Sequence, residues 1–137
     1  MPPQPKSPDP RPSEPRLPAP KLPTLIYHLA DRAAWDAARA RGLYFGSADD
    51  ARDGFIHFST AAEIEASAAK HRQGQANLVL LAVDPTMLGD ALRWEESRGG
   101  VRFPHLYAAL PVSAVRAAEP LPLGPDGRHV FPPLGLD

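Results

Sequence analysis

The sequence predicts a small α+β domain with a curved or split, mainly antiparallel sheet and two main helices. The first reason is the order of the predicted elements, which runs strand, helix, strand, helix and then mainly strands. The second reason is that two helices are too few to cover both faces of a large parallel sheet. A doubly wound α/β fold is therefore disfavoured.

The chain of 137 residues suits one domain with an extension at each end. Residues 1–23 hold ten of the 18 prolines. Because proline lacks an N–H and fixes φ, this segment is predicted to be a disordered Pro-rich extension with polyproline II character. We expect the ordered domain at residues 24–119 and an irregular C-terminal tail, rich in proline and glycine, at residues 120–137.

The first half of the domain is predicted to begin with a strand at residues 25–29, where β-branched and aromatic side chains gather. An alanine-rich helix follows, from an N-cap at Asp31 to a stop at Gly42. Residues 43–45 form either a short strand or a bend. Residues 47–53 are polar and acidic without periodicity, so they are predicted to be a loop.

The second half is predicted to hold a helix at about residues 61–72, which Gly74 ends. The continuous apolar run at residues 77–83 is typical of a central strand. The other predictions are a strand at 91–95, a turn at 97–100, a last clear strand at 106–110, and either a helical turn or extended chain at 112–115.

The composition disfavours several classes of protein. The formal net charge is −1 and the pI is about 6.5, so no basic field favours a nucleic-acid partner. The absence of cysteine excludes disulfides, thiolate metal sites and a cysteine nucleophile. The longest apolar run, Leu78 to Val83, is too short to span a bilayer, and no apolar leader is visible, so we expect a cytoplasmic protein without a membrane partner.

The most informative stretch surrounds His57. Gly54 suits a turn into a short strand, on which His57 and Ser59 share one face. Thr60 with Glu63 fits a capping box, so a helix is predicted to begin just after Thr60. An imidazole is then held two residues before a pair of hydroxyls at a helix N-terminus, which suits a polar or anionic small molecule.

Three histidines lie in or beside predicted strands, namely His28, His57 and His105. A three-histidine metal site is one interpretation, but their wide separation in the sequence gives no local ligand motif. A structural histidine at the edge of the core is the plainer interpretation of each one. No metal site is therefore predicted.

Two later segments each place polar groups on one face of a strand. Arg93 and Glu95 are either an exposed ion-pair ladder, or a guanidinium for phosphate and a carboxylate for a ribose hydroxyl or acid–base work. His105 and Tyr107 suit stacking on a planar ring, unless Pro104 simply marks an edge strand.

The usual nucleotide and hydrolase motifs are absent. The sequence contains no GxGxxG, P-loop or nucleophile elbow, which disfavours a Rossmann site and a Walker-type nucleotidase. Ser59 and His57 share a face of one strand but lack the geometry of a catalytic triad.

Taken in order, these motifs resemble the bacterial family catalogued as domain of unknown function 952. The resemblance covers the chain from about Thr24 to Val115, and the Pro-rich extension lies outside it. The segments that carry it are Ile26–His28, Asp53–Thr60, Asn77–Leu81, Arg93–Glu95 and Phe103–Tyr107.

The family in turn resembles a compact relative of the ADP-ribosyltransferase fold, which includes RNA 2′-phosphotransferases. The resemblance implies that His28 contacts a ribose of NAD and that His57 packs on the nicotinamide, with Ser59 and Thr60 after it. The third polar position is either Glu95 or His105. A histidine at the second position is closer to the phosphotransferase branch, but no counterpart of its basic RNA-binding domain is visible, so RNA is not the expected substrate.

The leading hypothesis is an ADP-ribosyl-transfer-type enzyme, or an NAD- or nucleotide-binding protein, with NAD as cofactor and a nucleotide-like small molecule as partner. The alternatives are a non-catalytic small-molecule-binding module, a His-ligated metal enzyme, and a structural or interaction module. The predicted catalytic residues are His57, Glu95 and His105, and the predicted binding residues are His28, Ser59, Thr60, Arg93 and Tyr107.

Overall fold

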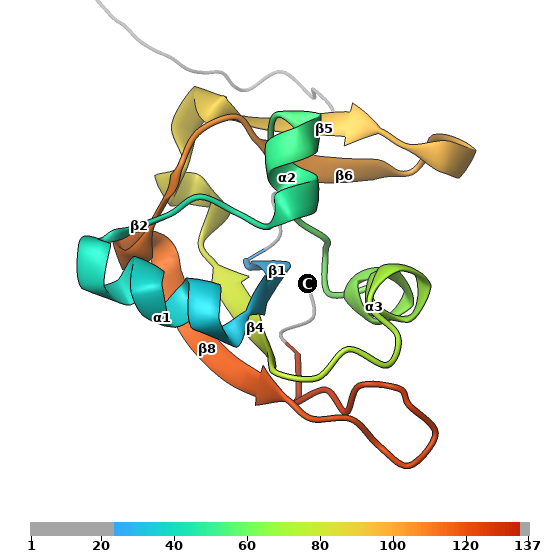
Figure 1. Cartoon of the computed structure of the whole chain (residues 1–137). Coiled ribbons are helices and arrows are strands. Elements are labelled where there is room, and N and C mark those ends of the chain that lie inside the picture. Colours follow the sequence, from blue (N-terminus) through green and yellow to red (C-terminus); the bar gives the residue numbers. More distant parts are fainter. Residues whose placement is uncertain (1–23, 135–137) are drawn as a thin grey trace, which may run out of the picture.

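The computed structural model describes residues 24–134 and shows an α+β fold (Figure 1). The predicted Pro-rich extension at residues 1–23 lies outside the described residues. Within residues 24–134 the strands form three antiparallel sheets, with strand orders β1-β4-β8, β2-β7 and β3-β6-β5. None of the helices in this part of the chain is long and apolar enough to cross a membrane.

Helices alternate with strands in the first half and strands dominate the second half, as predicted. Residues 24–134 contain three α-helices, however, where two main helices were predicted. The helices are α1 (Arg32–Arg41), α2 (Ala48–Asp53) and α3 (Ile64–His71). The strands are β1 (Ile26–Asp31), β2 (Leu43–Tyr44), β3 (Ile56–His57), β4 (Leu78–Val83), β5 (Leu92–Glu96), β6 (Arg102–Leu106), β7 (Leu110–Pro111) and β8 (Val115–Leu121). Short 3₁₀ helices occupy Pro85–Met87, Gly89–Ala91, Arg98–Gly100 and Val112–Ala114.

Sheet β1-β4-β8 forms the centre of the core. All six residues of β4 are buried, which confirms the central strand predicted from the apolar run. Val79 and Leu81 face a cluster that includes Trp35 of α1, whereas Leu80 faces a cluster that includes Ile64 of α3. The two helices therefore lie on opposite faces of this sheet (Figure 1), and each fully buried side chain contributes about 1.5–3 kcal/mol.

Sheet β3-β6-β5 is covered on one face. Ile56, Phe58 and Leu106 point into the first cluster, while His57 and His105 share the other face because they lie opposite each other in the β3–β6 register. This sheet meets β1 through Tyr27 and Ser59, whose backbones exchange two hydrogen bonds of 2.8 Å.

Two local predictions around the key stretch are wrong. Residues 47–53, predicted to be a loop, form α2, because Ser47 caps the helix and exchanges two hydrogen bonds with Asp50. The next helix starts at Ile64 and not at residue 61, and Thr60 makes no side-chain cap. Its carbonyl instead accepts hydrogen bonds from the N–H groups of Glu63 and Ile64 in a turn, at 3.0 Å each.

The C-terminal strands also differ from the prediction. The strand predicted at residues 106–110 is β6, which ends where the prediction began. Pro104 is accepted in β6 because it lies beside the end of the short β3, where its carbonyl still accepts a hydrogen bond from the N–H of Phe58 at 3.0 Å. β8 extends through Pro120 into the predicted tail, and it tolerates that proline at the edge of its sheet.

Residues 122–134 lie against the domain. Leu123 and His129 form a β-bridge, and His129 Nε2 contacts the carbonyl of Gln75 at 2.8 Å. Phe131 and Leu134 pack against the same cluster as α3. These two side chains therefore help to cover the cluster on the α3 side of the central sheet.

Candidate functional site

A cleft of about 420 Å³ lies between α2, α3 and the ends of β1, β3 and β6. Its walls mix basic, acidic and hydroxyl side chains. The polar and titratable residues that line it are Tyr27, His28, Ser47, Asp49, Asp50, Arg52, Asp53, His57, Ser59, Glu63, Ser67, Lys70, His71, Arg72, Ser97 and His105.

Four of the eight predicted site residues line this cleft, namely His28, His57, Ser59 and His105. The other four, Thr60, Arg93, Glu95 and Tyr107, do not line it. Glu95 is nevertheless joined to the cleft, since one of its carboxylate oxygens lies 2.8 Å from Nδ1 of His105.

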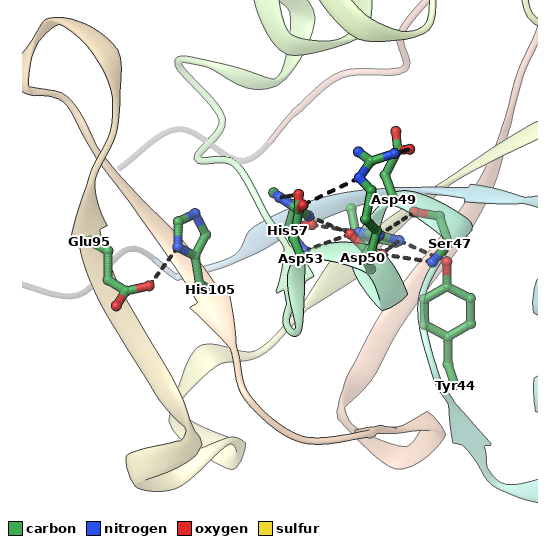
Figure 2. A network of polar contacts seen from close by, with 10 residues as sticks. Tyr44, Ser47, Asp49, Asp50, Asp53, His57, Glu95 and His105 are labelled. Atoms are coloured by element: carbon green, nitrogen blue, oxygen red, sulfur yellow. Dashed lines mark hydrogen bonds and ion pairs between the residues drawn. The ribbon is translucent and has the colours of Figure 1, made fainter.

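Asp50 is the centre of the polar network (Figure 2). Its carboxylate is only 3% exposed, and it accepts hydrogen bonds from the N–H of Ser47 at 2.8 Å and from the N–H of His57 at 3.1 Å. Its Oδ1 also lies 2.5 Å from Nδ1 of His57. Burial alone would raise the pKa of Asp50, but the His57 hydrogen bond, the nearby His28 and the two backbone donors together lower it.

The capping box that starts α2 explains why Asp50 is there. Ser47 Oγ accepts from the N–H of Asp50 at 3.2 Å, and this fixes the first turn so that the carboxylate points back toward β3. Gly46, with φ at 94°, leaves room for it, because a Cβ there would lie 2.7 Å from Asp50 Oδ2. Gly54, with φ at 89°, ends α2 and turns the chain into β3.

His57 is held between two carboxylates. Its Nδ1 faces Asp50, and its Nε2 lies 3.1 Å from Oδ2 of Asp53. The hydrogen bond to Asp50 is the main cause that raises the pKa of His57, against a smaller opposing effect of burial. Since both ring nitrogens face acceptors, His57 is best described as an imidazolium that donates from both.

His28 is the opposite case. It is 4% exposed, and burial lowers its pKa despite the attraction of Asp50, 3.7 Å away. Its Nδ1 lies 2.6 Å from the carbonyl of His57, which can only accept, so we assign the proton to Nδ1. Nε2 then accepts from the hydroxyl of Tyr44 at 2.7 Å. Burial also raises the pKa of Tyr44, which keeps that hydroxyl protonated.

A second carboxylate–histidine pair lies on the same face of sheet β3-β6-β5. Glu95 accepts from His105 Nδ1 at 2.8 Å and from the hydroxyl of Tyr107 at 2.7 Å. These two donors, with the Tyr107 bond the stronger influence, lower the pKa of Glu95. The ring of Phe55 stacks on His105 with centroids 4.1 Å apart, and the guanidinium of Arg93 lies 4.9 Å from the ring centroid of Tyr107.

Comparison with known proteins places this arrangement in a family. Residues 29–118 match the family described as protein of unknown function (DUF952). The chain belongs to this family. The recognition made from the sequence motifs is thereby confirmed, whereas the relationship of the family to the ADP-ribosyltransferase fold stays a hypothesis.

Solved structures of protein CC0527 from Caulobacter crescentus are similar to this DUF952 protein. A crystal structure is 54% identical, covers 78% of this chain and 94% of that chain, and has a TM-score of 0.75. A crystal structure of its double mutant is 53% identical in sequence to this chain, with the same coverage and TM-score. A solution NMR structure gives 55% identity, covers 77% of this chain and 90% of that chain, and has a TM-score of 0.69. No curated protein matches this chain.

Sequence reasoning missed the residues that fix the orientation and protonation of the histidines in this DUF952 site. These residues are Tyr44, Ser47, Asp50 and Asp53. One signal was available. The spacing of Ser47 and Asp50, followed by Gly54, is the pattern of a capped one-and-a-half-turn helix, and it would have placed an acidic side chain just before β3. Nothing comparable marks Tyr44, because its partner His28 is distant in the sequence.

The hypothesis of a three-histidine metal site gains no support. Both ring nitrogens of His28 are occupied, one by the His57 carbonyl and one by Tyr44. Over residues 24–134 no three His, Asp or Glu side chains are arranged as ligands for a metal ion.

Proposed function

We propose that the cleft binds a nucleotide-like small molecule, such as NAD or an ADP-ribosylated compound, and that His57 acts on it. The observation that carries this proposal is the Asp50–His57 pair, in which a buried carboxylate fixes an imidazole at the wall of a cleft. The cleft volume of about 420 Å³ lies in the range of small-molecule sites.

The roles follow from position and charge. His57 would donate a proton to the leaving group, and Glu63, which lines the same cleft, would stabilise positive charge that develops on a ribose. The hydroxyls of Ser59 and Ser67, 2.9 Å apart, would contact ribose oxygens. His28 would act indirectly by holding the His57 backbone, because its own nitrogens are engaged. Glu95 would act through His105.

A non-catalytic binding module is the second candidate, and one observation favours it. Both ring nitrogens of His57 already have carboxylate partners, Asp50 and Asp53, as in a purely structural ion-pair network. In that case His57 would contribute to affinity only.

The Tm measured by thermal denaturation with NAD and with ADP-ribose tests whether the domain binds a nucleotide at all. A ligand-dependent rise is expected both for an enzyme and for a non-catalytic binding module. A ligand at 100 times its Kd stabilises the fold by about 2.7 kcal/mol, which raises Tm by several degrees. We expect this rise in the wild type and in H129Q, a control histidine outside the cleft, and a smaller rise in H57Q. No rise with either ligand at millimolar concentration would contradict the proposal. Turnover lost in H57Q, with binding retained, would favour the enzyme over the binding module.

A further inference from the structure

We infer that the cleft cleaves phosphate esters, with His57 as general acid and His105 as general base. This inference rests on the proposed function, because it names the chemistry performed on the nucleotide-like ligand. It requires two imidazoles near one reacting group, one that donates a proton and one that accepts a proton.

The rings of His57 and His105 lie close together (Figure 2). His57 and His105 lie directly opposite each other in the β3–β6 register, and their ring centroids are 5.6 Å apart at an interplanar angle of 66°. Each ring is oriented through Nδ1 by its own carboxylate, Asp50 for His57 and Glu95 for His105. Both rings line the cleft. Each therefore has Nε2 as the nitrogen that can serve a substrate.

The two histidines differ in what occupies Nε2. In His57, Nε2 donates to Asp53, whose side chain is 38% exposed and can be displaced by a ligand oxygen. In His105, Nε2 has no hydrogen-bond partner within residues 24–134, and the bond from Nδ1 to Glu95 leaves its lone pair available. The first arrangement suits a proton donor and the second a proton acceptor.

The cations of the cleft favour an anionic substrate. Lys70 and Arg72 line it from the end of α3, and Arg52 lines it from α2. Guanidinium and ammonium groups suit phosphate oxygens. Arg52 now pairs with Asp49 and Asp53, and Arg72 with Asp31, so a phosphate would replace these carboxylates as their partner. The charged and titratable groups around the two rings are His28 from β1, Asp49, Asp50, Arg52 and Asp53 from α2, Glu63, Lys70, His71 and Arg72 from α3 and the turns at its ends, Arg93 and Glu95 from β5, and Tyr107 after β6.

The step balances without a metal or redox partner. The oxygen of water, or of a neighbouring ribose hydroxyl, bonds to phosphorus while Nε2 of His105 takes its proton. The bond from phosphorus to the leaving oxygen breaks as that oxygen receives the Nε2 proton of His57. One P–O bond forms and one breaks, and proton exchange with water then returns His57 to its cationic form and His105 to its neutral form.

Two phosphodiesters test this inference on the full chain, namely 2′,3′-cyclic AMP and bis(p-nitrophenyl) phosphate. We expect the wild type to hydrolyse 2′,3′-cyclic AMP with a bell-shaped dependence of kcat/KM on pH. H57Q and H105Q should each lower this value by about 10²–10⁴-fold, and H129Q should leave it unchanged. With bis(p-nitrophenyl) phosphate the loss in H57Q should be smaller than in H105Q, because p-nitrophenolate leaves without a proton.

The outcomes separate the two proposals. If NAD or ADP-ribose stabilises the protein but neither phosphodiester is cleaved, this inference is overturned and the proposed function stands. If bis(p-nitrophenyl) phosphate is cleaved, but 2′,3′-cyclic AMP is not cleaved and neither NAD nor ADP-ribose stabilises the protein, the nucleotide ligand is overturned. Equal rates in the wild type, H57Q and H105Q, with all three folded by circular dichroism, also overturn the histidine pair.

Discussion

The two larger sheets use their faces differently. Sheet β1-β4-β8 is packed on both faces, so β4 is apolar throughout and buried at every position. Sheet β3-β6-β5 packs on one face only, through Ile56, Phe58 and Leu106, and its other face carries the two histidines. The polar site therefore lies on sheet β3-β6-β5, because one face of this sheet is not packed into the hydrophobic core.

The contrast extends to the two histidines that meet at the junction of the sheets. His28, on the doubly covered sheet, has a lowered pKa through burial, while His57, on the open face, has a raised pKa through Asp50. A hydrogen bond from His28 Nδ1 to the carbonyl of His57 joins the two histidines. Burial thus makes His28 a neutral structural group, whereas the hydrogen bond to Asp50 makes His57 a cation available to a ligand.

The largest expected effect is at Asp50, whose carboxylate is buried beside His57 on the open face of sheet β3-β6-β5. D50N removes the charge and places an amide among donors, so we expect a loss of about 3–5 kcal/mol in the free energy of unfolding, measured by urea denaturation. D49N is the matched control. Asp49 is the preceding residue, is 62% exposed and pairs with Arg52, so its loss should cost below about 1 kcal/mol. Equal losses of unfolding free energy in D50N and D49N would show that the buried hydrogen-bond network of Asp50 does not stabilise the fold.

A core substitution tests the doubly covered sheet. Leu81 is fully buried at the centre of β4, and L81A should cost about 2–5 kcal/mol, from lost burial and the cavity left behind. The matched change on the open side is V101A, since Val101 lines the cleft and is 40% exposed. Its cost should stay within about 0.5 kcal/mol in the same denaturation experiment. A similar cost for both would remove the distinction between the sheets.

The doubly covered sheet was also the part that could be predicted from the sequence. The apolar run of β4 and the ends of α1 at Asp31 and Gly42 are local signals, and the structure confirms their positions. The Asp31 side chain, however, makes no cap hydrogen bond. β8 gave no such signal, because an edge strand needs little apolar surface and tolerates Pro120.

The alternation of side chains along a strand was the only part of the site that the sequence could predict. Alternation placed His57 beside Ser59 and His105 beside Tyr107, and the β3–β6 register brought the two histidines together. The partner of His57 was missed because Asp50 lies on a helix of six residues, too short for periodicity to reveal. The protonation of His28 depends on Tyr44, a contact that only the folded chain creates.

Tyr44 tests whether His28 is neutral because of its surroundings. Y44F removes the hydroxyl that donates to Nε2 and leaves a buried acceptor unsatisfied, so we expect a loss of about 1–3 kcal/mol. His28 would then gain stability by binding a proton at Nε2, which lies 3.7 Å from Asp50. NMR titration of the histidine rings should show the pKa of His28 rising in Y44F. An unchanged pKa of His28 would mean that Tyr44 does not set its protonation.

The smallest expected effect is the pH dependence that His57 gives to stability. The folded-state pKa of His57 lies above its ordinary value of 6.5, so its stabilising contribution is fully present below about pH 6.5 and is lost as pH rises through the folded-state pKa. The difference in unfolding free energy between wild type and H57Q should therefore be largest near pH 5 and shrink toward pH 9. Because the ring is 40% exposed, the change in this difference between pH 5 and pH 9 should stay below about 1 kcal/mol. The titration of His28, whose pKa is shifted the other way, is common to both proteins and largely cancels, so a difference that grew with pH would contradict a cationic His57.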